Sequence, residues 1–495
     1  MSSIAASNHP HMAPPAHPAG NSQPTLPAES SPVQTTGKVL VDDGNLRAAN
    51  VLVEEHYPEG TKMLADFLLL QTGEGSDTVH ISQLRNGQLC ANVNGKYYAF
   101  NTPVGSPKVA PYLHIRTGGG DDRITIDANV TIQVKIEAGD GNDTVRAGSG
   151  YTSVYGGRGN DDIQLGSGAG YAEGNEGNDT IKGGSGHTVI YGNSGNDRLY
   201  AGPGPASKHS HLDGGAGDDE LHAGNGHTVL NGGQGNDLMV AHDQTAVYTG
   251  AGRDIVRANA NKARIYAKAT DHLIGAQHST ITHVTPTEAG RQGFKILGSP
   301  RFVARVEDDL ALLRASPQGQ KMLDAMDKGA AKNGAPVTIV QSDDANGTYD
   351  FWSTELQKLE DTHQPRPARY DPRAGYIKEG VAGSRADRAT ISYNPAHAYN
   401  SPIPLLPLEL LYHEMAHAWN GANGTILPDP NSPDSDSEPT EPPNIELQAV
   451  GLPTNAPPFD FDNDPSTPPT STNPAPFNEN TMNTEWGKAL RTRYD

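Results

Sequence analysis

Apolar residues recur at a near-constant interval through the middle of the chain, each two positions after an aspartate. From about residue 117 the pattern is Gly-x-Gly-x-Asp-x-apolar, as in Gly139-Asp-Gly-Asn-Asp-Thr-Val145. Eight copies near a fixed period predict a solenoid whose turns are short strands and whose apolar residues fill the interior. The aspartates follow one another at intervals of 17 to 22 residues and are Asp122, Asp143, Asp161, Asp179, Asp197, Asp219, Asp237 and Asp254.

These repeats resemble the RTX nonapeptide GGxGxDxUx, and the resemblance implies a parallel β-roll over residues 117–285 that binds Ca²⁺ in its turns. Glycine permits the tight turns, and aspartate supplies a hard oxygen ligand for a hard cation. Only one half of each turn carries the aspartate, since the other half has Gly-Ser-Gly-His-Thr-Val at 184–189. We therefore predict a calcium column along at most one edge, with the eight aspartates as ligands. The alternative is a metal-free roll in which Asn-Asp pairs hydrogen-bond the turn backbone.

Two segments depart from the period. An outlying copy, Gly73-Glu-Gly-Ser-Asp77, is predicted to be an isolated rung. The insert Pro203–His211 stretches one interval to 22 residues and is predicted to be a surface loop.

Apolar positions change to helical spacing after about residue 290. A stripe that predicts a helix runs over Leu408, Leu411, Tyr412, Met415 and Trp419. Pro404 and Pro407 suit its start, and Gly421 and Gly424 suit its end. Further predicted elements are a helix from Ser316-Pro317 to Gly329, strands at Val337–Val340 and Ala389–Tyr393, and a helix at Thr481–Leu490. The strand at Ala389–Tyr393 is predicted to be the edge strand, where an extended peptide could pair.

The predicted helix at 408–419 carries His413-Glu-Met-Ala-His417, an HExxH pentapeptide. Two His at i and i+4 lie on one helix face and can bind one ion, and Glu414 can deprotonate a water bound to that ion. Imidazole and carboxylate ligands around one open position favour Zn²⁺. The alternative is a buried helix whose His residues are only hydrogen-bonded.

A third ligand has to come from downstream. The acids available are Asp429, Asp434, Asp436, Glu438, Glu441 and Glu446. The first five lie in a Pro-rich acidic loop at 428–443, which is too flexible to hold a ligand in place. Glu446 opens the helix-forming run Ile445–Val450, so we predict Glu446 as the third zinc ligand.

Composition limits the classes of partner. A net charge of −21 argues against nucleic acid and anionic membranes. No run of 18 apolar residues predicts a transmembrane helix, and the single Cys90 excludes an internal disulfide. The Ser/Pro-rich residues 1–37 lack the features of a Sec signal peptide and are predicted to be a disordered secretion leader. Residues 38–116 are predicted to be a β-rich lead-in to the roll.

The C-terminal residues 295–495, with Pro- and acid-rich loops at 428–443 and 453–476, resemble the NleD-like family of zinc metallopeptidase effectors. The resemblance rests on Ser316–Leu323, Val337–Val340, Leu410–His417, Glu446–Pro453, Asn478–Asn480 and Leu490–Tyr494. It implies an α+β zincin-like endopeptidase that type III secretion delivers into the host cell cytoplasm. It also implies a host signalling protein as substrate, since known members act on mitogen-activated protein kinases.

The end of the chain, Arg491-x-x-Tyr494, is similar to the Arg-x-x-Tyr pair of clostridial neurotoxin light chains. This similarity implies that Arg491 and Tyr494 stabilise the oxyanion, while Glu414 acts as the general base. Glu479 is a candidate acid for orienting one of the zinc-binding His residues.

Two other functions remain open. In the first, the protease region is inactive and the calcium-binding roll serves as a binding scaffold. In the second, the protein is an extracellular protease released by type I secretion. The order of the segments argues against the second, because such proteins typically carry their repeats near the C-terminus.

Overall fold

The computed structural model describes residues 33–57, 60–103, 105, 109–258, 262–342, 347–364, 370–396, 406–429, 443–462 and 464–493. The chain divides into two compact units, Met1–Gly168 and Ala169–Asp495. Residues 1–32 of the predicted leader lie outside the described residues. We predicted disorder up to residue 37, but a strand already begins at Val33.

The first unit is made of strands. Its lead-in has two antiparallel groups, β1–β2–β3 and β4–β5–β6. Strands β3 and β4 then pair in parallel with β7 and β8, the first strands of the roll. The bounds are β1 (Val33–Asp42), β2 (Arg47–Tyr57), β3 (Gly60–Gln71), β4 (Thr78–Gln83), β5 (Leu89–Val93), β6 (Lys96–Phe100), β7 (Tyr112–Gly119), β8 (Arg123–Ile126), β9 (Gln133–Asp140), β10 (Thr144–Arg146), β11 (Thr152–Arg158) and β12 (Asp162–Gln164).

The outlying repeat at Asp77 is not an isolated rung, so that prediction was wrong. The Asp77 backbone N–H donates to Asp122 Oδ1 at 2.7 Å, as the Asp122 N–H does to Asp143 Oδ1. The antiparallel insertion between Asp77 and Asp122 lengthens the interval in sequence without interrupting the stack of turns.

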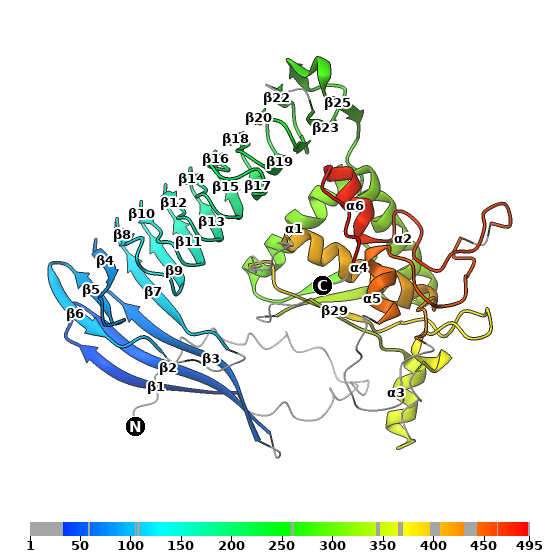
Figure 1. Ribbon diagram of the computed structural model, residues 1–495, viewed down its shortest axis with the longest axis horizontal. Helices are drawn as coiled ribbons and strands as arrows, with labels where there is room; N and C mark the ends of the chain where they lie inside the picture. Colours follow the sequence, from blue (N-terminus) through cyan, green and yellow to red (C-terminus); the bar gives the residue numbers. More distant parts are fainter. Residues whose placement is uncertain are drawn as a thin grey trace, which may run out of the picture. The chain divides into compact units, whose positions relative to one another are not determined.

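The roll continues in the second unit as two parallel sheets, which Figure 1 shows as successive short strands. Residues 112–283 thus form turns of a parallel β-solenoid, as predicted. Ile181, Leu199 and Leu221, each two positions after a repeat aspartate, are fully buried. The bounds are β13 (Gly170–Glu176), β14 (Thr180–Lys182), β15 (Thr188–Ser194), β16 (Arg198–Tyr200), β17 (His209–Ala216), β18 (Glu220–His222), β19 (His227–Gln234), β20 (Leu238–Ala241), β21 (Thr245–Tyr248), β22 (Ile255–Ala258), β23 (Arg264–Ala267), β24 (His272–Ile274) and β25 (Thr280–His283), with a 3₁₀ turn η1 (Ala276–His278).

Glycine is required where neighbouring turns approach. Gly195 has φ +124°, and a Cβ there would overlap the Gly177 carbonyl of the preceding turn. Any other residue would be strained by this backbone conformation and would also push the turns apart. The period of the glycines therefore sets the spacing of the turns.

The rest of the second unit combines helices with a four-stranded sheet, as predicted for an α+β region. Helix α4 packs against α2, α5 and α6. The bounds are β26 (Phe294–Leu297), α1 (Pro300–Ala315), α2 (Pro317–Asn333), β27 (Val337–Gln341), β28 (Thr348–Asp350), α3 (Thr354–Asp361), η2 (Pro372–Ala374), β29 (Thr390–Tyr393), α4 (Pro407–Asn423), α5 (Asn444–Val450) and α6 (Glu479–Trp486).

The edge strand differs from the prediction. The sheet order is β26-β27-β29-β28, with β28 antiparallel to β29. The predicted strand at 389–393 is thus inside the sheet, and among the described strands β28 is at the edge. The short segment Thr348–Asp350 has too few residues to show the alternation that identifies a strand.

Helix α2 is longer than predicted. It begins at Pro317 with Ser316 as its N-cap, as predicted, but it passes Gly329 and ends at Gly334, which has φ 86°. A Cβ at Gly329 would lie 3.4 Å from the Ala422 Cβ on α4. Gly329 therefore permits close packing of two helices rather than ending one.

Candidate metal sites

Helix α4 places the HExxH residues inside the protein. Pro407 is its first residue, and Gly424, with φ 70°, ends it. The helix is apolar on most of its surface, and every residue from Pro407 to Ala422 is buried. His413, Glu414 and His417 are the polar exceptions in its middle, each between 4% and 6% exposed. Polar side chains buried this deeply need partners, so their surroundings indicate what they do.

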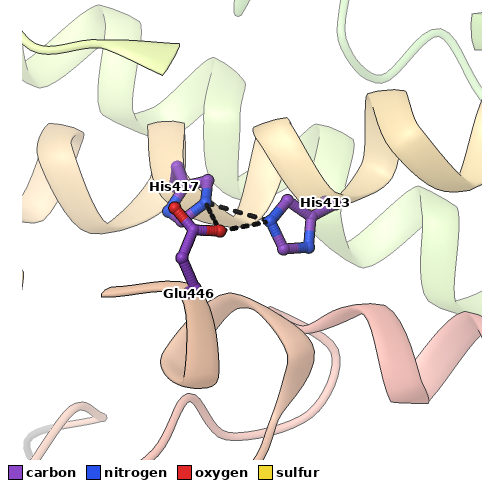
Figure 2. Close-up of side chains that lie close together, drawn as sticks. All are labelled: His413, His417 and Glu446. Carbon is purple, nitrogen blue, oxygen red and sulfur yellow. Dashed lines mark hydrogen bonds and ion pairs between the residues drawn. The ribbon is translucent and has the colours of Figure 1, made fainter. Parts of the chain in front are cut away.

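His413, His417 and Glu446 converge from α4 and α5 (Figure 2). The two Nε2 atoms are 3.1 Å apart, and Glu446 Oε2 lies 3.1 Å from His413 Nε2 and 3.4 Å from His417 Nε2. In the described part of the chain, these residues form the one group of three or more His, Cys, Asp or Glu side chains close enough to hold one ion.

The spacing of these atoms fits a tetrahedral zinc ion. Ligand atoms about 2.0–2.1 Å from such an ion are about 3.3 Å from one another, and the three separations scatter around that value. Two imidazoles and one carboxylate also form a known zinc donor set that leaves a position for water. The residues present therefore fit the ion.

Two carboxylates, those of Glu446 and Glu479, favour the protonated form of the His413 ring. Burial lowers the pKa of His413, but its hydrogen bonds to Glu446 and Glu479 outweigh burial and raise that pKa to about 10. A metal ion has to displace this proton, because it needs the Nε2 lone pair.

A second layer of residues holds His413 from its other side. Glu479, the first residue of α6, accepts from His413 Nδ1 at 3.1 Å. Arg491 Nη1 donates to the same Glu479 Oε2 at 2.9 Å, and the Arg491 backbone is bonded in both directions to the Asn480 side chain. An Nδ1–H that donates to Glu479 leaves Nε2 free for a metal. Glu479 thus lies where an orienting acid is needed.

Glu414 lies next to the edge of the sheet. A Cβ at Gly347, the residue before β28, would lie 2.8 Å from Glu414 Cγ. Burial raises the Glu414 pKa, whereas His417 and His413 act against this rise. The edge strand and the predicted general base are therefore neighbours.

Tyr349 on β28 was missed by sequence reasoning. Its ring stacks at 17° on His417, with centroids 6.4 Å apart. A Cβ at Gly421 would overlap the Tyr349 hydroxyl, so only glycine leaves room for this side chain. Gly421, inside α4 rather than at its end, is the signal in the sequence that something large approaches the helix there.

The aspartates of the roll form a regular ladder. In the second unit, the N–H of Asp197, Asp219 and Asp237 donates to Oδ1 of the aspartate one turn later, at 2.7 to 3.0 Å. The Oδ2 atoms of the same three residues are buried and have no hydrogen-bond partner. Burial raises the pKa of Asp197 and Asp237 to about 8. These oxygens are suited to a hard cation.

The ladder ends differently from the prediction. Asp254 Oδ2 has a partner, because Lys268 Nζ lies 2.8 Å away. One more aspartate, Asp271, accepts the Asp254 N–H at 3.3 Å. Asp271 lacks the preceding glycines, and its distance of 17 residues from Asp254 was the available signal.

The other edge of the roll has different chemistry. The rings of His187, His209 and His227 lie in a row with neighbouring centroids 5.6 Å apart; the first pair is edge-on at 64° and the second is tilted by 32°. Lys208 Nζ donates to the carbonyls of Gly184 and Ala201 at 2.6 and 2.5 Å and to that of Pro203 at 3.0 Å. The predicted surface loop at 203–211 is thus partly wrong: its end enters β17, and Lys208 is fully buried.

Helix α6 also contacts the roll. Glu485 accepts from the Tyr248 hydroxyl at 2.6 Å through Oε1 and from the Tyr266 hydroxyl at 2.7 Å through its carbonyl. His227 Nε2 donates to the Trp486 carbonyl at 2.8 Å. One end of this eight-residue helix thus contacts His413, and the other end contacts β19, β21 and β23.

Comparison with known proteins supports both halves of this description. Residues 290–494 match the model of the Peptidase M91 family, described as effector protein. Residues 136–172, 173–205 and 210–239 match the RTX calcium-binding nonapeptide repeat. No curated protein and no solved structure matches the chain. The C-terminal region is thus similar to a family of peptidase effectors, and the repeats are similar to those that bind calcium in secreted proteins.

Some predicted residues have no described geometry. Tyr494, Asp434, Asp436, Glu438 and Glu441 lie outside the described residues. Asp429 is described and is not part of the group around His413. In the described segments, no helix is long and apolar enough to cross a membrane.

Proposed function

We propose that the C-terminal region is a zinc endopeptidase and that the protein is secreted to act on a protein of a host cell. The observation that carries this proposal is the convergence of His413 Nε2, His417 Nε2 and Glu446 Oε2 on a buried helix. The match to the peptidase effector family over 290–494 supports peptide hydrolysis as the reaction.

In this proposal, His413, His417 and Glu446 hold the zinc ion. When bound, zinc polarises the scissile carbonyl and acidifies a water molecule. Glu414 accepts the proton of that water and later returns it to the leaving amine. The burial that raises the Glu414 pKa suits this task, because a carboxylate with a raised pKa both accepts and releases a proton more readily near neutral pH.

Glu479 and Arg491 are positioning residues in this proposal. Glu479 fixes the His413 ring, and Arg491 fixes Glu479 at 2.9 Å. We had predicted that Arg491 would stabilise the oxyanion, but its partner lies on the Nδ1 side of His413, away from the converging Nε2 atoms. Tyr494 keeps the predicted oxyanion role.

The substrate is proposed to pair with β28 as an extended strand. β28 is the described edge of the sheet, and Gly347 at its start lies against Glu414. An edge strand offers unpaired backbone groups to a peptide, which then lies next to the general base. A host signalling protein such as a mitogen-activated protein kinase, reached by type III secretion, is the narrower proposal from the NleD-like resemblance.

The decisive experiment joins metal analysis to substrate mapping. Purified full-length protein should contain about one zinc per chain, and incubation with host-cell lysate should produce new protein N-termini. E414Q should retain zinc and lose cleavage by about 100-fold to 10,000-fold, the usual contribution of a general base. A zinc-free protein that produces no new N-termini would instead favour the inactive scaffold with the roll as its working surface. An E414Q variant as active as the wild type would rule out Glu414 as the general base.

A further inference from the structure

The last turn of the aspartate ladder contains an internal cation. At Asp197, Asp219 and Asp237, Oδ1 accepts a backbone N–H and Oδ2 is buried without a partner. At Asp254, Oδ1 accepts the Asp237 N–H in the same way. The difference lies in Oδ2 alone, which has the Lys268 ammonium 2.8 Å away.

The surroundings of this ammonium are those of a cation site. Lys268 Nζ also donates to the Gly250 carbonyl at 2.5 Å and lies 3.4 Å from Asp271 Oδ1. Two carboxylate oxygens and one backbone carbonyl are the kinds of oxygen that Ca²⁺ selects. An ammonium has three donors, so it can satisfy all three oxygens. The Asp254 and Asp271 side chains are fully buried, and they would cost much free energy without a counterion.

The carboxylate of Asp271, the last aspartate of the ladder, is also fully used. Asp271 Oδ2 accepts from the Thr249 hydroxyl at 2.7 Å and from the Lys268 backbone N–H at 2.8 Å. Both oxygens of the last aspartate are therefore bonded within the protein. A further calcium ion would find no free carboxylate oxygen there.

We propose that Lys268 takes the place of a calcium ion at the last turn, so that the ladder binds calcium up to Asp237 and closes at Asp254 without it. The proposal rests on calcium binding by the RTX-like repeats and is independent of the zinc site. It removes Asp254 from the predicted calcium ligands. It also makes the folding of the last turn independent of the calcium concentration.

This independence matters for the neighbouring helix. Tyr266, two residues before Lys268, donates to the Glu485 carbonyl of α6. One of the three turns that contact α6, the one that carries Tyr266, thus has its own cation. In a compartment poor in calcium, such as host cytosol, the earlier turns should loosen while the turn with Tyr266 stays folded and keeps its contact with α6.

Lys208, at the opposite edge, provides an informative contrast. Its Nζ also fills a group of three oxygens, but all three are backbone carbonyls. Without a carboxylate, the space that remains after removal of this lysine should not hold calcium tightly.

The test is the calcium stoichiometry of the full-length chain. K268M should bind one more calcium per chain than the wild type in titration calorimetry and metal analysis. K262M, which removes an exposed lysine from the same region, should leave the count unchanged. K208M should also leave it unchanged. An unchanged count in K268M, or an added ion in K208M, would overturn the proposal, as would a wild-type chain that binds no calcium.

Hydrogen exchange provides a second readout that does not depend on counting ions. With a chelator, wild-type β22–β25 should stay protected while β13–β18 lose protection. In K268M, β22–β25 should lose protection with the chelator and regain it in millimolar calcium. Uniform loss in the wild type, or a K268M variant that calcium does not restore, would contradict the proposal. Neither readout involves proteolysis, so failure here is distinct from failure of the protease assignment.

Discussion

The aspartate ladder and the His413 cluster are both candidate metal sites, but the chain builds them in opposite ways. Each ladder position takes its carboxylate and its hydrogen-bond partner from neighbouring turns, about 18 residues apart. The cluster takes its ligands from positions 413, 417 and 446, with Glu479 and Arg491 behind them.

This difference has consequences for how each site fails. A ladder built from equivalent turns should lose ions and stability step by step, since each turn mainly contacts its neighbours. A cluster whose ligands come from two helices should lose its metal when any one ligand is removed. The predictions below test this contrast, beginning with the largest effect.

Removal of one ligand should abolish zinc binding. E446Q removes the charge and one oxygen of the carboxylate at nearly constant volume, and H417A removes an imidazole. Both should lower zinc affinity by more than about 100-fold, beyond the range for outer-layer partners, as measured by chelator competition. D429N changes an acid outside the cluster and should bind zinc as the wild type does. Normal zinc binding by E446Q would make another residue the third ligand.

Removal of calcium should have the next largest effect, and it should fall on the roll. Each site at 100 times its dissociation constant stabilises the folded state by about 2.7 kcal/mol, so the melting temperature of the roll should drop by many degrees in a calcium chelator. Zinc content, measured in parallel in calcium-free buffer without chelator, should be unaffected. A roll with the same melting temperature in chelator and in millimolar calcium would favour the metal-free alternative.

Disruption of the outer layer should weaken zinc binding without abolishing it. E479Q keeps the size of the side chain but loses the charge that orients His413, and a loss of about 10-fold to 100-fold in zinc affinity is expected. R491M should have a smaller effect in the same direction, because Arg491 acts through Glu479. The ratio of kcat to KM should then recover in excess zinc for both variants. If R491M instead lost kcat at full zinc occupancy, Arg491 would contact the substrate.

The last prediction concerns the pH dependence of stability. The folded-state pKa of Asp197 and Asp237 is about 8, far above the unfolded value of 3.8. In calcium-free protein, the folded state therefore holds protons that the unfolded chain releases, and the free energy of unfolding should fall as pH rises from about 4 to about 8. Saturating calcium should remove the slope over this range, because it binds the ionised form and the folded carboxylates then hold no more protons than those of the unfolded chain. Equal slopes with and without calcium would contradict cation binding at these carboxylates.

The roll could be predicted from the sequence because its contacts repeat with the period of its residues. The positions of Ile181 and Leu199 behind their aspartates identify the buried face directly. Prediction failed where a partner comes from outside the repeat. Lys268 fills the space beside Asp254, and the antiparallel insertion before Asp122 hides the turn that begins at Asp77.

In the C-terminal region, the sequence predicted helix α4 and the candidate ligand Glu446, because a buried helix and a short helix-forming run have local patterns. The same reliance on local sequence patterns placed the end of α2 too early, at Gly329. Gly329 resembles a helix end, yet it lies against Ala422 on α4, a contact that depends on tertiary packing. Tyr349 and the edge position of β28 could not be predicted either, because both depend on how distant segments meet.

The hydrogen bonds between α6 and the roll determine where a stable C-terminal fragment of the protein can begin. A fragment that begins at residue 290, where the family match starts, would leave the Glu485 carboxylate without the Tyr248 hydroxyl and the Trp486 carbonyl without His227. The same fragment would expose to solvent the side of α6 that contacts the roll. Helix α6 begins with Glu479, which hydrogen-bonds His413. A protease excised in this way should have a frayed C-terminal helix. A boundary before Thr245 would retain both tyrosines, and one before β19 would retain His227 as well.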